Sequence, residues 1–168
     1  YNRLLETNPD LGCEQCDKSW GDGSGFFLRR VRLVFFGQVS KKVYIYIQPD
    51  FASSTGGALN FLQLRDAYVD LGIDDDNEFR FRLGQSKIPY GFENMQSSQN
   101  RLTLDRADGI NSAFVNERDL GIFFYWAPKE IRERFSLLVR SGLKGSGDYG
   151  VAGIGIFNGQ GANKPEAN

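Results

Sequence analysis

The sequence predicts an all-β protein whose antiparallel strands each carry one apolar and one polar face. Two observations support this prediction: six segments place apolar residues at every second position, and their connections alternate between short turns and long polar stretches. Up-and-down barrels of the outer membrane have this rhythm, with short periplasmic turns and long outer loops. The pattern alone fits a soluble β-sandwich or a lipocalin-like barrel equally well.

The first predicted strand shows the period of two most plainly. Val31, Leu33 and Phe35 lie on its apolar face, whereas Arg30 and Arg32 lie on its polar face. The same alternation recurs along the chain, and the predicted strands cover residues 27–39, 43–50, 62–72, 78–88, 118–126 and 149–158.

The connections between these strands differ in length and composition. Residues 74–77 predict a short turn, whereas residues 51–61 are rich in Ser, Thr and Gly and predict a longer loop. Residues 90–116 are too long and too polar for an ordinary connection, which indicates a functional loop. Residues 129–141 follow a proline and place apolar residues at helical spacing, so they predict a short amphipathic helix.

Composition argues against several classes of function. The 168 residues include 20 Lys and Arg against 21 Asp and Glu, so the chain lacks the basic excess of a nucleic-acid-binding protein. It has no His, the commonest general base and zinc ligand, and no pair of carboxylates suggests catalysis, so we expect no enzyme, metal or cofactor. The longest apolar run, residues 120–127, is too short for a transmembrane helix. Transmembrane strands need only about 9–11 alternating residues and leave the mean hydropathy low.

The arginines favour the membrane barrel over the soluble alternatives. Arg30 and Arg32, and likewise Arg80 and Arg82, lie two residues apart on polar faces, and a guanidinium group suits bidentate recognition of oxyanions. Six strands are fewer than the roughly eight of the smallest membrane barrels, and both outer strands would expose unpaired edges. We therefore expect the barrel to continue in missing sequence or in other chains.

Several segments together resemble the phosphate-selective porins O and P. The similarity covers about residues 26–160 and rests on the order and spacing of the motifs FLRRVRL, LRDAYVDL, RLGQSKIPYGFE, NERDLG and LKGSGDYG. It implies a sixteen-stranded, homotrimeric barrel in the bacterial outer membrane, surrounded by lipid, that passes inorganic anions such as phosphate. The present chain would be the N-terminal part of that barrel.

The resemblance also implies a division of the chain into segments. Residues 1–25 would form an outer loop, and residues 26–160 would supply the barrel strands. Within them, residues 90–116 would fold into the lumen and residues 129–141 would form a periplasmic helix. Residues 161–168 would begin a further outer loop.

The family's constriction matches this sequence at a few positions. Arg29 and Arg30 match its arginine pair, Asp66 matches an acidic residue of the pore waist, and Arg106 matches a basic residue of the inward loop. Asn94 falls where phosphate-selective members carry a lysine, which leaves a general anion or small-solute channel open. With the residues added by strand parity and by charge, the expected anion path comprises Arg29, Arg30, Arg32, Asp66, Arg82, Lys87, Asn94, Arg101 and Arg106.

Two other interpretations stay open for these residues. The arginines could form ion pairs that hold the inward loop in place, and the barrel could be structural or adhesive with a plugged lumen. Arg29 and Arg65 have the parity of the lipid face, where long basic side chains extend toward the rim.

The two cysteines form a Cys-x-x-Cys motif in the first polar segment. Zinc needs four ligands, and redox motifs of this spacing usually open a helix, which this segment does not predict. An oxidising compartment favours a small disulfide between Cys13 and Cys16. A metal or redox role is the alternative.

Overall fold

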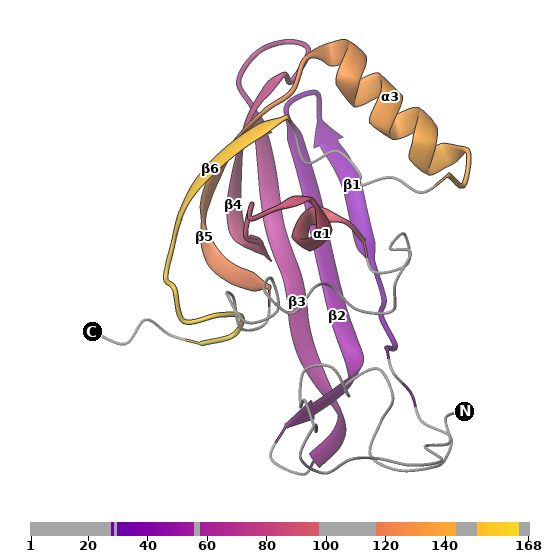
Figure 1. Cartoon of the computed structure of the whole chain (residues 1–168), viewed down its shortest axis with the longest axis vertical. Helices are drawn as coiled ribbons and strands as arrows, with labels where there is room; N and C mark the ends of the chain where they lie inside the picture. Colours follow the sequence, from indigo (N-terminus) through magenta and orange to yellow (C-terminus); the bar gives the residue numbers. More distant parts are fainter. Residues whose placement is uncertain (1–27, 29, 56–57, 98–116, 144–150, 165–168) are drawn as a thin grey trace.

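The described strands form one antiparallel sheet. The computed structural model describes residues 28, 30–55, 58–97, 117–143 and 151–164. Within these residues, six strands pair in chain order, each with the next, so the predicted all-β, up-and-down arrangement is confirmed (Figure 1). The elements are β1 (Phe35–Ser40), β2 (Val43–Thr55), β3 (Ala58–Gly72), β4 (Phe79–Lys87), α1 (Phe92–Met95), β5 (Arg118–Trp126), α3 (Lys129–Arg140) and β6 (Ala152–Phe157).

The two faces of the sheet differ in chemistry. On one face, apolar side chains pair across strands, as Leu83 does with Val69 and Ile122, and many of them, Leu83 and Ile122 included, remain exposed. Ile122 is 54% exposed and Ile154 is 71% exposed. A water-soluble protein rarely exposes so continuous an apolar surface.

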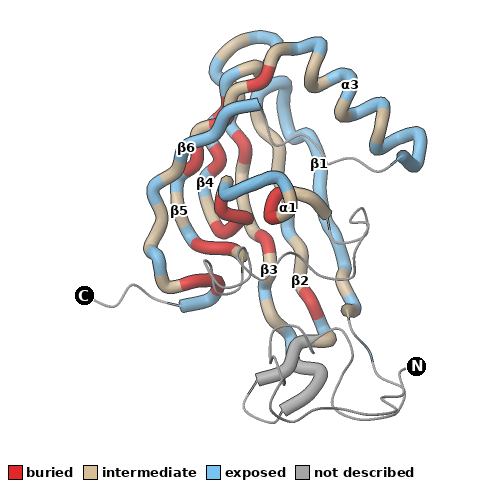
Figure 2. The backbone as a smooth tube through the Cα atoms, in the orientation of Figure 1, coloured by how far each residue is buried: buried red, intermediate tan, exposed pale blue. Residues whose placement is uncertain are grey.

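The opposite, polar face carries most of the buried residues. Figure 2 shows that these residues gather along β4 and β5 and at α1. A small apolar cluster of Met95, Phe123 and Tyr125 lies there, with Phe157 packed against it. Outside this cluster most of the buried side chains are polar or charged, which is the reverse of a soluble core.

Glycines on β6 make room for aromatic rings on β5. A Cβ atom added at Gly153 would lie 2.9 Å from the ring of Tyr125, and one added at Gly155 would collide with the ring of Phe123. Gly153 pairs with Tyr125 and Gly155 with Phe123 in the register of the two strands. The rings therefore lie flat over the neighbouring strand because that strand has no side chain there.

The predicted loop over residues 51–61 is wrong. β2 continues to Thr55 and β3 begins at Ala58, so almost all of this segment is paired strand. Its pairing shifts register at three places between Gln48 and Ser54. Each shift interrupts the alternation of apolar and polar residues, so the sequence pattern predicts a loop where the structure has a strand.

The other elements differ from the prediction mainly at their ends. β5 has the predicted bounds, and α3 ends one residue earlier than expected. The first strand is regular only from Phe35, although an isolated bridge already joins Arg32 to Asp50. The short helix α1, inside the predicted polar loop, was not anticipated.

Contacts at the turn between β3 and β4 fasten the start of α3. The backbone N–H of Lys129 donates to Oε1 of Glu78 at 2.8 Å, and its ammonium group lies 2.8 Å from Oδ1 of Asp76. Arg132 donates to the carbonyl oxygens of Asp76 and Asn77. The helix is thus held at the same end of the sheet as the short turns. None of the described helices has the length and apolar character needed to cross a membrane.

Candidate functional site on the polar face

The charged side chains on the polar face belong to strands whose successive residues point to opposite faces of the sheet. On β3 the residues Asp66, Tyr68 and Asp70 share this face, and on β4 the residues Arg80 and Arg82 do so, because successive side chains point to opposite sides of a strand. All of the charged members of this set are buried. The pairing of the strands then decides which charges meet.

Arg82 is held by a carboxylate and two aromatic rings. Its Nε and Nη2 atoms donate to the two carboxylate oxygens of Asp70, its register partner, at 2.7 and 2.8 Å. Its guanidinium carbon lies 3.7 Å from the ring centroid of Tyr68 and 5.1 Å from that of Tyr125. The residue is 3% exposed. These contacts fix the guanidinium group and offset part of its charge.

The ring of Tyr68 is also stacked on its other neighbour. The rings of Tyr46 and Tyr68 have centroids 5.2 Å apart and an angle of 10° between their planes. Phe36 continues the row, 6.4 Å from Tyr46. Aromatic rings and one guanidinium group therefore form a continuous row across β1 to β5.

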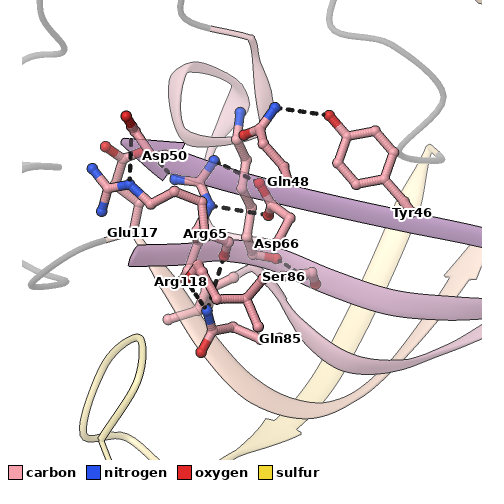
Figure 3. Close-up of polar contacts among 12 residues, drawn as sticks. Tyr46, Gln48, Asp50, Arg65, Asp66, Gln85, Ser86, Glu117 and Arg118 are labelled. Carbon is pink, nitrogen blue, oxygen red and sulfur yellow. Dashed lines mark hydrogen bonds and ion pairs between the residues drawn. The ribbon is translucent and has the colours of Figure 1, made fainter. Parts of the chain in front are cut away.

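A second buried ion pair joins β3 to β5. Nε and Nη2 of Arg118 donate to the two carboxylate oxygens of Asp66, each at 3.0 Å, and Nη1 lies 3.3 Å from Oε2 of Glu117. Figure 3 shows these side chains together with Arg65. Arg118 is 2% exposed, so the pair is largely shielded from solvent.

Sequence reasoning missed Arg118. Strand parity places it with Leu120 on the apolar face, but it is the first residue of β5, and Glu117 before it has a left-handed backbone with a φ of 65°. The strict alternation of side-chain direction within a strand does not extend to its first residue. The only signal in the sequence is an arginine that begins an otherwise apolar strand face.

Asp50 collects contacts from two arginines. Its Oδ2 atom lies 2.7 Å from Nε of Arg32 and 3.7 Å from Nε of Arg65, and its Oδ1 atom accepts from the backbone N–H of Val31 and Ala52. The expectation that Arg65 belongs to the lipid face is wrong. The register passes from Gln48–Asp66 to Pro49–Leu64 and leaves Arg65 as a bulge, which shifts the alternation by one residue.

A small cavity lies among these pairs. Its volume is about 50 Å³, room for little more than a few water molecules. Residues from the segment before β1, from β2 to β5 and from the segment after α1 surround it: Arg32, Tyr46, Gln48, Asp66, Tyr68, Arg82, Lys87, Ser97 and Arg118. A larger cavity of about 320 Å³ lies nearer the turns, where Lys42, Arg80 and Arg132 contribute to its wall.

An apolar face turned outward and a polar, charged face turned inward are the arrangement of outer-membrane barrel strands. The family model for phosphate-selective porin O and P matches residues 9–168. The chain belongs to the phosphate-selective porin O and P family. It is therefore an outer-membrane porin of bacteria, and its family is a class of channels rather than of enzymes. Comparisons with curated proteins and with solved structures give no significant match.

The structure places the predicted site residues of this porin unevenly. Arg32, Asp66, Arg82 and Lys87 are brought together around the small cavity. Arg30 is half-buried and takes part in contacts of its own. The remaining predicted basic residues and both cysteines lie outside the described residues: Cys13, Cys16, Arg29, Arg101 and Arg106.

Asn94 and Lys87 both contact backbone carbonyls. Nδ2 of Asn94 donates to the carbonyl of Ile88 at 2.7 Å, and the residue is 2% exposed. Nζ of Lys87 donates to the carbonyls of Met95 at 3.2 Å and Gln96 at 2.7 Å. Both side chains thus connect the end of β4 to the segment that follows it.

Proposed function

We propose that the polar face of this sheet lines a water-filled lumen that passes small anions with a modest preference over cations. The observation that carries the proposal is the concentration of basic side chains on this face, four of which form ion pairs with acidic ones. The basic residues are Arg32, Arg65, Arg80, Arg82, Lys87 and Arg118, and the acidic ones are Asp50, Asp66, Asp70 and Glu117. Fixed positive charge in a narrow path favours anions.

The acidic partners support a weak rather than a tight anion site. Two unit charges 4 Å apart interact by about 4 kcal/mol at an effective dielectric constant of about 20, so each paired carboxylate offsets much of the attraction of its arginine for a passing anion. Rapid passage requires that no site hold the ion firmly. Asp66 in its bidentate pair with Arg118 fits the tempering role expected of an acid at the waist.

The same pairing favours a second candidate, a general small-solute channel with little charge selectivity. Arg82 and Arg118 are each engaged by a carboxylate through two hydrogen bonds. If these pairs persist while solutes pass, the lumen presents nearly balanced charge. The two candidates differ in one measurable quantity, the ratio of anion to cation permeability.

We also propose that the sheet is one part of a larger closed barrel. Among the described strands, β1 and β6 stand at the two edges of the sheet. Open edges are unfavourable within hydrocarbon because their backbone groups find no water there. A homotrimer, as the resemblance implies, stays a prediction that chemical cross-linking of the assembled porin in outer membranes tests.

The proposal is tested by conductance of the assembled porin in planar bilayers. The reversal potential in a KCl gradient should indicate anion preference, and Asp66→Asn should increase that preference because the variant removes one of the negative charges beside Arg118. Asp75→Asn is the matched control, since the side chain of Asp75 is fully exposed in a turn. Inorganic phosphate should reduce the chloride current more strongly in Asp66→Asn.

Cation preference of the unmodified porin would contradict the anion proposal. A reversal potential near zero in both the unmodified porin and Asp66→Asn would favour the general small-solute channel. Negligible conductance would instead support the structural or adhesive barrel.

A further inference from the structure

The segment after β4 folds back onto the polar face. β4 ends at Lys87, Gly91 turns the chain with a φ of 72°, and α1 follows at Phe92–Met95. Figure 1 shows α1 lying across the sheet rather than beyond its end. Ser97, two residues after this helix ends, lines the small cavity together with residues of β2. The position of α1 therefore sets one wall of that cavity.

Polar contacts fasten this segment at both of its ends. Nζ of Lys87 donates to the carbonyls of Met95 and Gln96, which are among the unsatisfied acceptors at the C-terminal end of α1. Asn94 donates to the carbonyl of Ile88, and the backbone N–H of Ile88 donates to the carbonyl of Glu117 at 3.1 Å. The segment is thereby joined to β4 and to the start of β5.

An apolar contact completes the attachment. Met95 is 9% exposed and belongs to the cluster with Phe123 and Tyr125 on the polar face of β5. Those two rings lie over the glycines of β6, which gives Met95 a fixed surface to pack on. Lys87 and Met95 thus attach α1 through independent interactions, one by charge-assisted hydrogen bonds and one by apolar packing.

We propose that Lys87 is a positioning residue that latches α1 against the barrel wall and thereby sets the width of the lumen, rather than a residue that binds the passing anion. The proposal rests on the proposed function only in that this face lines a conducting lumen. The ammonium group of Lys87 is turned to the carbonyls of the inward segment, and the residue is 7% exposed. A lysine so placed contributes to selectivity chiefly through the shape that it maintains.

The two roles give opposite expectations for Lys87→Met. A latch that loses hydrogen bonds to a charged group should raise the ratio of detached to docked α1 by roughly 10- to 150-fold per bond. Single-channel conductance should then rise, with added open-channel noise. A residue that binds anions directly should instead leave the conductance unchanged or lower, and should shift the reversal potential toward cations.

Three further variants make the test specific. Met95→Ala removes the apolar half of the latch without changing any charge, so it should raise conductance and noise as Lys87→Met does. Lys87→Arg keeps donors for the two carbonyls and should restore most of the unmodified conductance. Lys42→Met is the matched charge control, because Lys42 lies at the turn between β1 and β2 and its side chain is 44% exposed.

The measurements use the assembled porin in planar bilayers, after heat-dependent mobility on gels shows that each variant folds. Increased conductance in both Lys87→Met and Met95→Ala, with a reversal potential shifted no more than in Lys42→Met, supports the latch. Unchanged conductance in both variants overturns the latch. A reversal potential that shifts in Lys87→Met well beyond its shift in Lys42→Met, without added open-channel noise, overturns it as well. Failure of the anion proposal can be told apart from failure of the latch, because the anion proposal is tested by the reversal potential of the unmodified porin.

Discussion

Breaking the ion pair between Asp66 and Arg118 should destabilise the barrel substantially. Both carboxylate oxygens of Asp66 accept hydrogen bonds from Arg118 at 3.0 Å, and the side chains are only 8% and 3% exposed. Removing one partner of a buried pair usually costs about 3–5 kcal/mol, because the other charge is left without compensation. Asn retains one acceptor oxygen, and Glu117 stays near Arg118, so we expect Asp66→Asn to cost about 3 kcal/mol, the lower end of that range.

The assay is equilibrium unfolding in urea, with the porin in lipid vesicles. With Trp20, the other tryptophan, replaced by Phe in all variants, emission from Trp126, at the other end of β5 from Arg118, reports on the strand that the pair anchors. The double variant Asp66→Asn/Arg118→Gln removes both charges of this pair. It should therefore be less destabilised than the sum of the two single variants, by an interaction energy of about 1–2 kcal/mol.

Asp75→Asn serves as the control for loss of a carboxylate, since the Asp75 side chain is fully exposed. Equal midpoints for Asp66→Asn and Asp75→Asn would refute the reasoning, because they would mean that the buried pair contributes nothing beyond a surface charge. Strict additivity in the double variant would show that the two side chains do not act together.

Two further outcomes follow from contacts elsewhere in the sheet. Gly155→Val should lower the free energy of unfolding by about 1–3 kcal/mol, and with it the urea midpoint, because its side chain would displace the ring of Phe123. Gly37→Val, whose Cβ meets nothing within 4 Å, should not. The hydrogen bond from the backbone N–H of Phe79, with others from the same turn, lowers the pKa of Asp74 below its usual value of 3.8. A lowered folded-state pKa stabilises the fold above the unfolded pKa and loses that contribution as pH falls through the folded value, so Asp74→Asn should flatten the acid limb of a stability–pH profile. An unchanged acid limb in that variant would show that the turn carboxylate has no such role.

The strands were predictable where alternation is unbroken. β5 matches its predicted bounds because nine consecutive residues keep one pairing with β4 and no bulge intervenes. The segment around Asp50 failed for the opposite reason. Three register shifts there interrupt the alternation of apolar and polar residues. The local sequence, which is rich in Ser and Gly, does not indicate that pairing with the neighbouring strand will hold it in an extended conformation.

For the candidate site, the sequence predicted which face of the sheet several residues occupy, but not which side chains they contact. Parity correctly placed Arg32, Asp66 and Arg82 on the polar face, where they line one cavity. It could not identify Asp50 and Asp70 as the acids that engage the arginines, because those pairs depend on register between strands. The alternative that arginines form ion pairs with acids of the inward loop stays a prediction; within the described residues, Arg32 and Arg82 pair with Asp50 and Asp70 of β2 and β3.

The sequence by itself determined that the protein is a two-faced antiparallel sheet of the porin type. Side-chain alternation is a local property of strand backbone, and the order of the motifs along the chain needs no folding to be read. Only the tertiary structure decided that Arg118 meets Asp66, that Arg65 turns inward, and that Lys87 holds α1. Each of these depends on a bulge, a strand end or a folded-back segment, where contacts are set by distant parts of the chain rather than by neighbouring residues.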